Sequence, residues 1–306
     1  MSIKKPDLFL IGAPRCGTSS LFRWLTDHPD VNGTHPKETF FLMDPDHPLL
    51  NRDANLIQHG WKSFDRFAES RAQAKWLLEA TTHHIYQETA LQAICELDDH
   101  VRLLVVLREP SSRLRSSFNY TKHNLGNLPI GYSFKEYAND AIAGKYGNEV
   151  RQSQSSFVLQ NDLRHGRYHD YLKKWKSVFG SRLYPVIFEQ MQVNPRQELE
   201  KICRFLELPA KFYTGYSFNV RNASRVPISP GYQKFAKKLY RRTPKILRPA
   251  WIADLYRRIG TRRISSNGAD KATMTELNEY YRDSNSALAK LLDLDLQLWE
   301  TMTDAS

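Results

Sequence analysis

Leu8 to Leu21 read LFLIGAPRCGTSSL, an apolar run followed by a glycine-rich turn and three hydroxyl residues. The spacing of Gly12 and Gly17 equals that of a Walker A loop, and backbone N–H groups at the start of a helix bind anions. A Walker A loop has a lysine directly after its second glycine, whereas this chain has Thr18, and its cation is Arg15 inside the turn. The segment therefore predicts a phosphate-binding strand, turn and helix, and argues against hydrolysis of ATP or GTP. The alternative is an ordinary tight turn capped by Thr or Ser.

A second candidate anion site follows the most apolar segment of the chain, Val101 to Leu107 (VRLLVVL). Such a continuous apolar run is typical of a buried parallel strand. Arg108 stands at the carboxyl end of this strand, where α/β sheets bind ligands, and Ser116 follows about two turns into the next helix. A guanidinium and a hydroxyl suit a phosphate monoester, although a solvated basic helix start is the alternative. Two anion sites on one sheet predict a ligand with two separated phosphate-like groups.

The remainder of the chain alternates short apolar runs with amphipathic stretches, a pattern typical of α/β proteins. The expected strands are Leu8–Ile11, Trp76–Glu79, Val101–Leu107 and Leu183–Phe188. The expected helices are Thr18–Asp27, Pro110–Tyr120, Tyr168–Phe179 and Pro195–Leu206. Residues 121–150, rich in Gly and Asn, are expected to form an insertion or a loop-bearing segment. We see no repeat and no clean linker, and therefore expect residues 1–306 to form a single domain.

Composition excludes several classes of protein. With 306 residues, 41% of them hydrophobic and 25% charged, the chain is neither disordered, collagen-like nor a multi-span membrane protein. Its three cysteines are too few and too scattered for a disulfide framework or a cysteine-rich zinc site. No targeting or transmembrane segment is visible at the N-terminus. A reducing cytoplasm is the expected compartment.

The net charge of +11 comes from one region. Residues 234–263 hold eleven Lys or Arg and one acidic residue, interleaved with aromatic and aliphatic side chains. They belong to a C-terminal region, about 231–306, that we expect to be basic and helical. This region could bind an anionic acceptor, meet acidic lipid headgroups, or simply be a solvated helical face. Charge alone would also permit nucleic-acid binding, but no fold signature for it accompanies the charge, and we expect none.

Taken in order, these segments resemble the sulfotransferase family that uses 3′-phosphoadenosine-5′-phosphosulfate (PAPS). The resemblance covers about residues 6–230 and is closest to the carbohydrate (heparan-type) and bacterial branch. It implies a three-layer fold, with a central parallel sheet of the P-loop NTPase-like type flanked by helices. It also implies PAPS as sulfuryl donor, 3′,5′-adenosine bisphosphate (PAP) as product, and no metal. The segments that carry it are GAPRCGTSSL, LREPSSRLRSSF, HGRYHDYLKKWKSVFG, LYPVIFEQM and ELEKICRFLELP.

The resemblance also implies roles for individual residues. Arg15 replaces the lysine that is common in the family, and we expect it to stabilise charge on the leaving 5′-phosphate without donating a proton. Arg108 and Ser116 would bind the 3′-phosphate. The expected contacts to the 5′-phosphosulfate are Arg15, Cys16, Gly17, Thr18, Ser19 and Ser20, and further nucleotide contacts are Tyr168, Arg221 and Arg225.

Two candidates remain for the general base that activates the acceptor. Residues 35–41 (HPKETFF) resemble the family segment whose glutamate is the base, which points to Glu38, with Lys37 nearby for the sulfate charge. In the cytosolic branch of the family, the base is a histidine placed near His83 or His84. Adjacent histidines also suggest a metal site, but no third ligand at a useful spacing supports one.

The expected reaction is transfer of a sulfuryl group to a hydroxyl or amine of a small-molecule or carbohydrate acceptor, which the basic region suggests could be anionic. The acceptor pocket is expected in the variable loops 44–75 and 121–160. The sequence leaves the acceptor's identity and the oligomeric state open. Two alternatives are a P-loop-type nucleotide kinase and a non-catalytic nucleotide- or glycan-binding module. The missing Gly-Lys-Ser/Thr argues against the kinase, and the arginine at Arg15 keeps the binding module in consideration.

Overall fold

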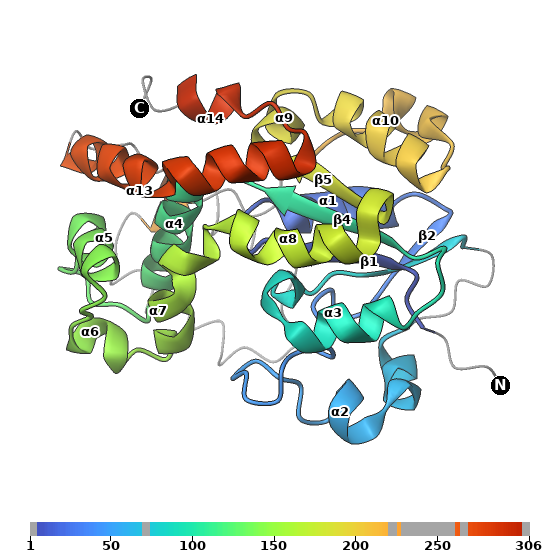
Figure 1. Ribbon diagram of the computed structural model, residues 1–306, viewed down its shortest axis with the longest axis horizontal. Helices are drawn as coiled ribbons and strands as arrows, with labels where there is room; N and C mark the ends of the chain where they lie inside the picture. Colours follow the sequence, from blue (N-terminus) through green and yellow to red (C-terminus); the bar gives the residue numbers. More distant parts are fainter. Residues whose placement is uncertain (1–4, 69–73, 220–224, 228–260, 264–268, 302–306) are drawn as a thin grey trace. The chain divides into compact units, whose positions relative to one another are not determined.

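The computed structural model describes residues 5–68, 74–219, 225–227, 261–263 and 269–301 (Figure 1). The chain divides into two compact units. The first unit comprises residues 1–114, 161–221 and 274–306, and the second comprises residues 115–160 and 222–273. That the whole chain forms a single sulfotransferase domain stays a prediction.

The first unit contains a five-stranded sheet in the order β2-β3-β1-β4-β5, and all of its neighbouring strands are parallel. Its strands are β1 (Leu8–Gly12), β2 (Val31–Gly33), β3 (Trp76–Glu79), β4 (Arg102–Leu107) and β5 (Leu183–Ile187). The four predicted strands are confirmed to within one residue at each end. Only β2, three residues long, went unpredicted, because so short a strand shows no periodicity.

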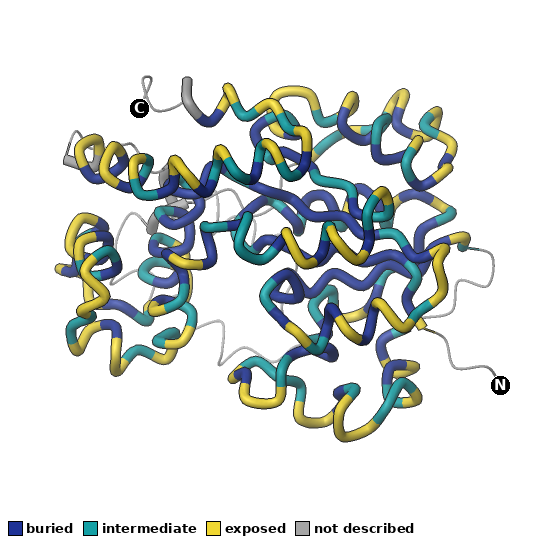
Figure 2. Tube along the Cα trace, viewed as in Figure 1, coloured by how far each residue is buried: buried dark blue, intermediate teal, exposed yellow. Residues whose placement is uncertain are grey.

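The apolar strands form the centre of the core. Every residue of β1 and β3 is buried, as are five of the six residues of β4 (Figure 2). A strand with helices on both of its faces buries side chains on both, which explains why β4 (RLLVVL) is apolar at five successive positions instead of alternating polar and apolar residues. The predicted α/β class with a central parallel sheet flanked by helices is therefore confirmed.

Helices cover both faces of this sheet. The helix α1 (Thr18–Thr26) lies on one face, and α3 (Glu88–Cys95) and α8 (Tyr168–Phe179) lie on the other. In Figure 1, α3 and α8 lie in front of the strands and α1 lies behind them. The remaining helices of the first unit are α2 (Leu56–His59), η1 (Trp61–Phe67), η2 (His84–Tyr86), η4 (Gly180–Arg182), α9 (Phe188–Val193), α10 (Pro195–Leu206), η5 (Ala210–Gly215) and α14 (Gln297–Thr301).

The second unit is built mainly from the segment expected to carry loops. Its elements are the π-helix η3 (Tyr120–Leu125), α5 (Phe134–Ala143), α6 (Asn148–Arg151) and the antiparallel pair β6 (Arg225–Pro227) and β7 (Thr261–Arg263). A capping box starts α5: Ser133 Oγ accepts from the Glu136 N–H, and the Glu136 carboxylate accepts from the Ser133 N–H. The segment expected to carry loops therefore contains two helices, of which α5 has a side-chain cap and α6 has none.

Three helices contain residues of both units: α4 (Pro110–Asn119), α7 (Ser156–His165) and α13 (Ala269–Leu292). The predicted helices after Arg108 and at 168–179 and 195–206 are confirmed as α4, α8 and α10. Most of the basic segment 234–263, residues 234–260, lies outside the described residues, so its predicted role stays a prediction. None of the helices in the described ranges is both long and apolar enough to cross a membrane.

Candidate active site

The two predicted anion-binding segments follow neighbouring strands. β1 pairs with β4, and past the end of β1 the Ala13 N–H donates to the Val106 carbonyl at 2.8 Å. The glycine-rich turn after β1 and Arg108 after β4 therefore lie at the same carboxyl edge of the sheet, which is where α/β proteins bind ligands. The Arg108 Nη1 donates to the Arg15 carbonyl at 3.3 Å, so the second segment contacts the first directly.

The turn after β1 presents the start of α1 as an anion site. Arg15 and Gly17 adopt left-handed backbone angles, with φ of 70° and 81°, and α1 begins at Thr18. No side chain in the described ranges caps this helix start. The Ser20 N–H donates to the Gly17 carbonyl at 3.0 Å, so the N–H groups that the helix start can offer to an anionic ligand are those of Thr18 and Ser19. Ser20 is buried in α1, and Ser19 is half-buried beside it.

Arg108 is held by packing and by the backbone. Its guanidinium carbon lies 4.9 Å from the centre of the Phe188 ring, and the Tyr168 hydroxyl donates to its carbonyl at 3.0 Å. The same hydroxyl lies 3.6 Å from the Cys16 sulfur. Burial raises the pKa of the Cys16 thiol to about 11, so this cysteine is neutral at pH 7 and is no nucleophile. Arg15, Cys16, Arg108 and Tyr168, predicted to share a site, therefore lie together.

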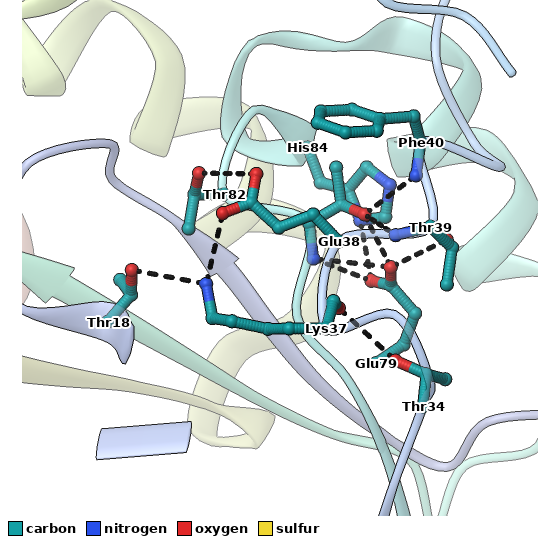
Figure 3. A network of polar contacts seen from close by, with 10 residues as sticks. Thr18, Thr34, Lys37, Glu38, Thr39, Phe40, Glu79, Thr82 and His84 are labelled. Carbon is teal, nitrogen blue, oxygen red and sulfur yellow. Dashed lines mark hydrogen bonds and ion pairs between the residues drawn. The ribbon is translucent and has the colours of Figure 1, made fainter. Parts of the chain in front are cut away.

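Lys37 connects the start of α1, after the glycine-rich turn, to the candidate base Glu38 (Figure 3). Its Nζ lies 3.4 Å from the Thr18 hydroxyl and 3.1 Å from Glu38 Oε1. The Thr82 hydroxyl donates to Glu38 Oε2 at 3.3 Å. The Glu38 side chain is 31% exposed, so its carboxylate is accessible while it is held from two sides. A cation, a carboxylate and the helix start thus converge at one point.

A buried network supports the segment that carries Glu38. Thr81 Oγ1 accepts the N–H groups of Thr39 and Phe40, the two residues after Glu38, at 2.9 and 3.1 Å. It donates in turn to the fully buried carboxylate of Glu79. Burial raises the pKa of Glu79, but the nearby His84 and the hydrogen bonds from Thr81 outweigh it and hold the pKa below its ordinary value. Glu79 and Thr81 were not predicted as site residues from the sequence. The signal that could have indicated them is a carboxylate at the carboxyl end of a buried strand, where α/β sheets place their sites.

His83, the other candidate base, is 8% exposed and packs among histidines. Its ring centre lies 5.7 Å from that of His47 and 6.4 Å from that of His165. Burial, together with the nearby His47, His84 and Arg113, lowers the pKa of His83 to about 3. The ring is therefore neutral at pH 7 and binds a proton only weakly, which is a poor property for a general base.

The other predicted site residues are distributed differently. Ser116 is buried in α4 and belongs to the second unit, and Arg225 begins β6 in that unit. Arg221 lies outside the described residues. Across the described ranges, no group of three His, Cys, Asp or Glu side chains is placed to hold a metal ion, and the expectation that none is needed stays a prediction. All three cysteines are free thiols.

Comparison with known proteins adds a family match. The family model described as "Sulfotransferase domain" matches residues 5–227. Human bifunctional heparan sulfate N-deacetylase/N-sulfotransferase 3 is 22% identical over 94% of this chain and 30% of its own length. Human carbohydrate sulfotransferase 15 is 21% identical over 97% of this chain and 55% of its own length. The chain therefore spans between about a third and a half of these curated relatives.

One solved structure shows the same fold. A sulfotransferase from Alicyclobacillus acidocaldarius superposes with a TM-score of 0.66 at 20% sequence identity, and the match covers 97% of this chain and 100% of that chain. This likeness agrees with the parallel sheet and its flanking helices.

Proposed function

Because this chain belongs to the sulfotransferase domain family, which its match over residues 5–227 shows, we propose that it transfers the sulfuryl group of PAPS to a hydroxyl or amine and releases PAP. The family predicted from the sequence is confirmed, and with it the class of enzyme. The donor, the acceptor and the residue roles that follow are our proposal.

The observation that carries the proposal is the position of Lys37. Its ammonium bridges Thr18, at the start of the phosphate-binding helix, and Glu38, a predicted base. Sulfuryl transfer requires an acceptor-activating base on one side of the sulfur and stabilisation of a leaving phosphate on the other. Lys37 lies between groups suited to these two tasks, and its ammonium can neutralise the negative charge of the sulfuryl group as it is transferred.

The residues divide the reaction between them. The acceptor oxygen or nitrogen forms a bond to sulfur, the bond from sulfur to the 5′-phosphate oxygen breaks, and the acceptor proton passes to the Glu38 carboxylate. The first-turn N–H groups of α1, together with Arg15, stabilise the charge that develops on the departing phosphate. Thr82 orients the Glu38 carboxylate through its hydrogen bond to Oε2.

Arg108 is proposed to bind the 3′-phosphate. It lies at the end of β4, beside the turn that would bind the 5′-phosphosulfate, and its guanidinium can form two parallel hydrogen bonds to phosphate oxygens. The donor set fits an adenosine carrying phosphate groups at two positions. This argues against the nucleotide kinase, whose loop lysine the chain lacks. Ser116, Tyr168, Arg221 and Arg225 stay predicted contacts.

We take Glu38 rather than His83 as the base. Glu38 is accessible and touches the cation beside the phosphate-binding turn. His83 is buried and has a pKa of about 3, so the imidazole is too weak a base to accept a proton from an alcohol. For the acceptor, the names of the relatives favour a carbohydrate hydroxyl or amine over a nucleic acid. The cytoplasm stays the expected compartment.

The donor is tested by thermal unfolding with PAP, with ADP and without ligand. A ligand selective for the folded state stabilises it by about 2.7 kcal/mol at a hundredfold excess over Kd. We expect a clear rise in Tm with PAP and little with ADP. Equal rises in Tm with PAP and ADP would favour a generic nucleotide site and the kinase. No rise in Tm with either ligand would contradict the assignment of PAPS as the donor.

The base is tested by Glu38→Gln, with transfer of label from radiolabelled PAPS to desulfated glycosaminoglycans and phenols as the assay. The amide keeps the size of the side chain but cannot take the proton, so turnover should fall roughly hundredfold or more. PAP binding should persist. Glu88→Gln, which alters an exposed Glu–Lys pair with Lys174, is the matched control and should leave turnover unchanged. Retained turnover in Glu38→Gln, with loss in His83→Gln, would assign the base to His83.

A further inference from the structure

The C-terminal helix α14 lies outside the residues matched by the family model, which ends at residue 227. Its Trp299 is nevertheless almost fully buried, with 3% of its surface exposed. The indole Nε1 donates to Glu189 Oε2 at 2.9 Å, and the indole ring centre lies 6.3 Å from that of Tyr168. A residue from the end of the chain thus contacts two side chains next to the candidate donor site.

Glu189 and Tyr168 form hydrogen bonds to the N–H and the carbonyl of the same peptide group. The Tyr168 hydroxyl donates to the Arg108 carbonyl at 3.0 Å, and the Glu109 N–H donates to Glu189 Oε1 at 3.0 Å. This carbonyl and this N–H belong to the peptide that joins Arg108 to Glu109, directly after β4. Rotation of that peptide would break both hydrogen bonds.

The same turn is fixed from its other end. The Glu109 carboxylate accepts the N–H groups of Ser111 and Ser112 at 2.7 and 2.6 Å, and so caps the first turn of α4. The Arg108 guanidinium packs on Phe188, the residue before Glu189. Both the backbone and the guanidinium of Arg108 therefore depend on the start of α9, where Glu189 sits.

We propose that Trp299 is a positioning residue for the donor site: it orients Glu189 and Tyr168, which clamp the Arg108–Glu109 peptide and so present the Arg108 guanidinium to the 3′-phosphate. Glu189 is buried and accepts one N–H on each carboxylate oxygen. Without the indole N–H, one oxygen loses its donor and the carboxylate is free to turn away from Glu109. The inference rests on the proposed 3′-phosphate role of Arg108.

The test compares the affinities of PAP and of adenosine 5′-monophosphate, which lacks only the 3′-phosphate, for the full chain by isothermal titration calorimetry. Trp299→Phe keeps an aromatic ring and removes the N–H. We expect PAP to bind roughly tenfold more weakly and the monophosphate to bind as in the wild type, so the ratio of the two affinities falls. A purely structural role would lower Tm but leave that ratio unchanged.

Trp76→Phe is the matched control, because the buried Trp76 Nε1 donates to the Leu206 carbonyl at 3.0 Å and touches neither clamp residue. It should leave the ratio unchanged. An unchanged ratio in Trp299→Phe would overturn the inference. If that variant does not fold, Tyr168→Phe removes the other half of the clamp and should lower the ratio in the same way, and an unchanged ratio there would overturn the clamp. If the wild type itself does not prefer PAP to the monophosphate, the proposed role of Arg108 fails first.

Discussion

Acidification should destabilise this protein through its buried histidines, well above the pH at which carboxylates titrate. His83 is 8% exposed and its pKa is lowered by burial, and by His47, His84 and Arg113, from 6.5 to about 3. His165 is 6% exposed, and burial lowers its pKa well below 6.5 as well. The His83 ring therefore stays neutral in the folded state at pH 5, whereas it is protonated in the unfolded chain, and the lowered pKa of His165 acts in the same direction.

The sign and size follow from proton linkage. Below pH 6.5 the unfolded state binds more protons than the folded state, so the free energy of unfolding falls as the pH falls. Each such histidine removes about 1.4 kcal/mol per pH unit, which is about 2 kcal/mol between pH 6.5 and pH 5. His83 alone should thus cost about 2 kcal/mol, a sizeable share of the roughly 5–15 kcal/mol typical of folded proteins, and the lowered pKa of His165 adds a loss of the same sign. Glu189 has the opposite effect on stability. Burial raises its pKa, so the folded state binds this proton more readily than the unfolded state, and protonation of Glu189 stabilises the folded state as the pH falls.

Urea unfolding at pH 7, 6 and 5 measures this loss directly. His83→Asn removes one of the two groups, so its free energy of unfolding should fall by about 2 kcal/mol less than that of the wild type over the same range. The reasoning is refuted if His83→Asn and the wild type lose stability equally between pH 7 and pH 5.

Two further substitutions test packing beside the site. Gly17→Ala should cost about 1–3 kcal/mol in urea unfolding, because φ is 81° and the added Cβ would lie 2.6 Å from the Phe188 ring; a neutral effect would mean that this turn adjusts freely. Asp162→Asn should cost about 3–5 kcal/mol, because it leaves the fully buried Arg113 without its 2.7 Å ion-pair partner. Asp170→Asn, which alters a partly exposed pair, should cost under about 1 kcal/mol and is the comparison for it.

Local patterns were sufficient for most of the fold. The apolar runs of β1 and β4, the glycines of the turn at residues 12–17 and the periodicity of α8 and α10 each depend on neighbours in sequence. Such patterns predict where an element begins and ends, because backbone geometry and capping act over a few residues. The strand β2 and the helix α6, of three and four residues, were not predicted because elements this short carry weak periodicity; α5 was missed because it lies in a Gly- and Asn-rich segment that was expected to carry loops.

The candidate site was predictable only as a set of residue types. From the sequence, Glu38 was the candidate base and a histidine at 83 or 84 the competing one; the structure buries His83 among other histidines and leaves Glu38 accessible beside Lys37, which is why we propose Glu38. Tyr168 was expected to contact nucleotide, and the structure engages its hydroxyl with the Arg108 carbonyl. Burial and partners decide such roles, and neither is written in a side chain's local sequence.

Residue identity by itself determined which chemical groups the chain can offer: guanidinium groups that we propose to bind phosphate, and a carboxylate next to a lysine that we propose to act in proton and sulfuryl transfer. The distances between these side chains were determined by the tertiary structure alone. Thr39 and Glu79 are 40 residues apart, and Glu189 and Trp299 are 110 apart, yet each pair shares a hydrogen bond. A hydrogen bond acts over about 3 Å, so contacts of this kind exist only after the sheet has brought the ends of its strands to one edge.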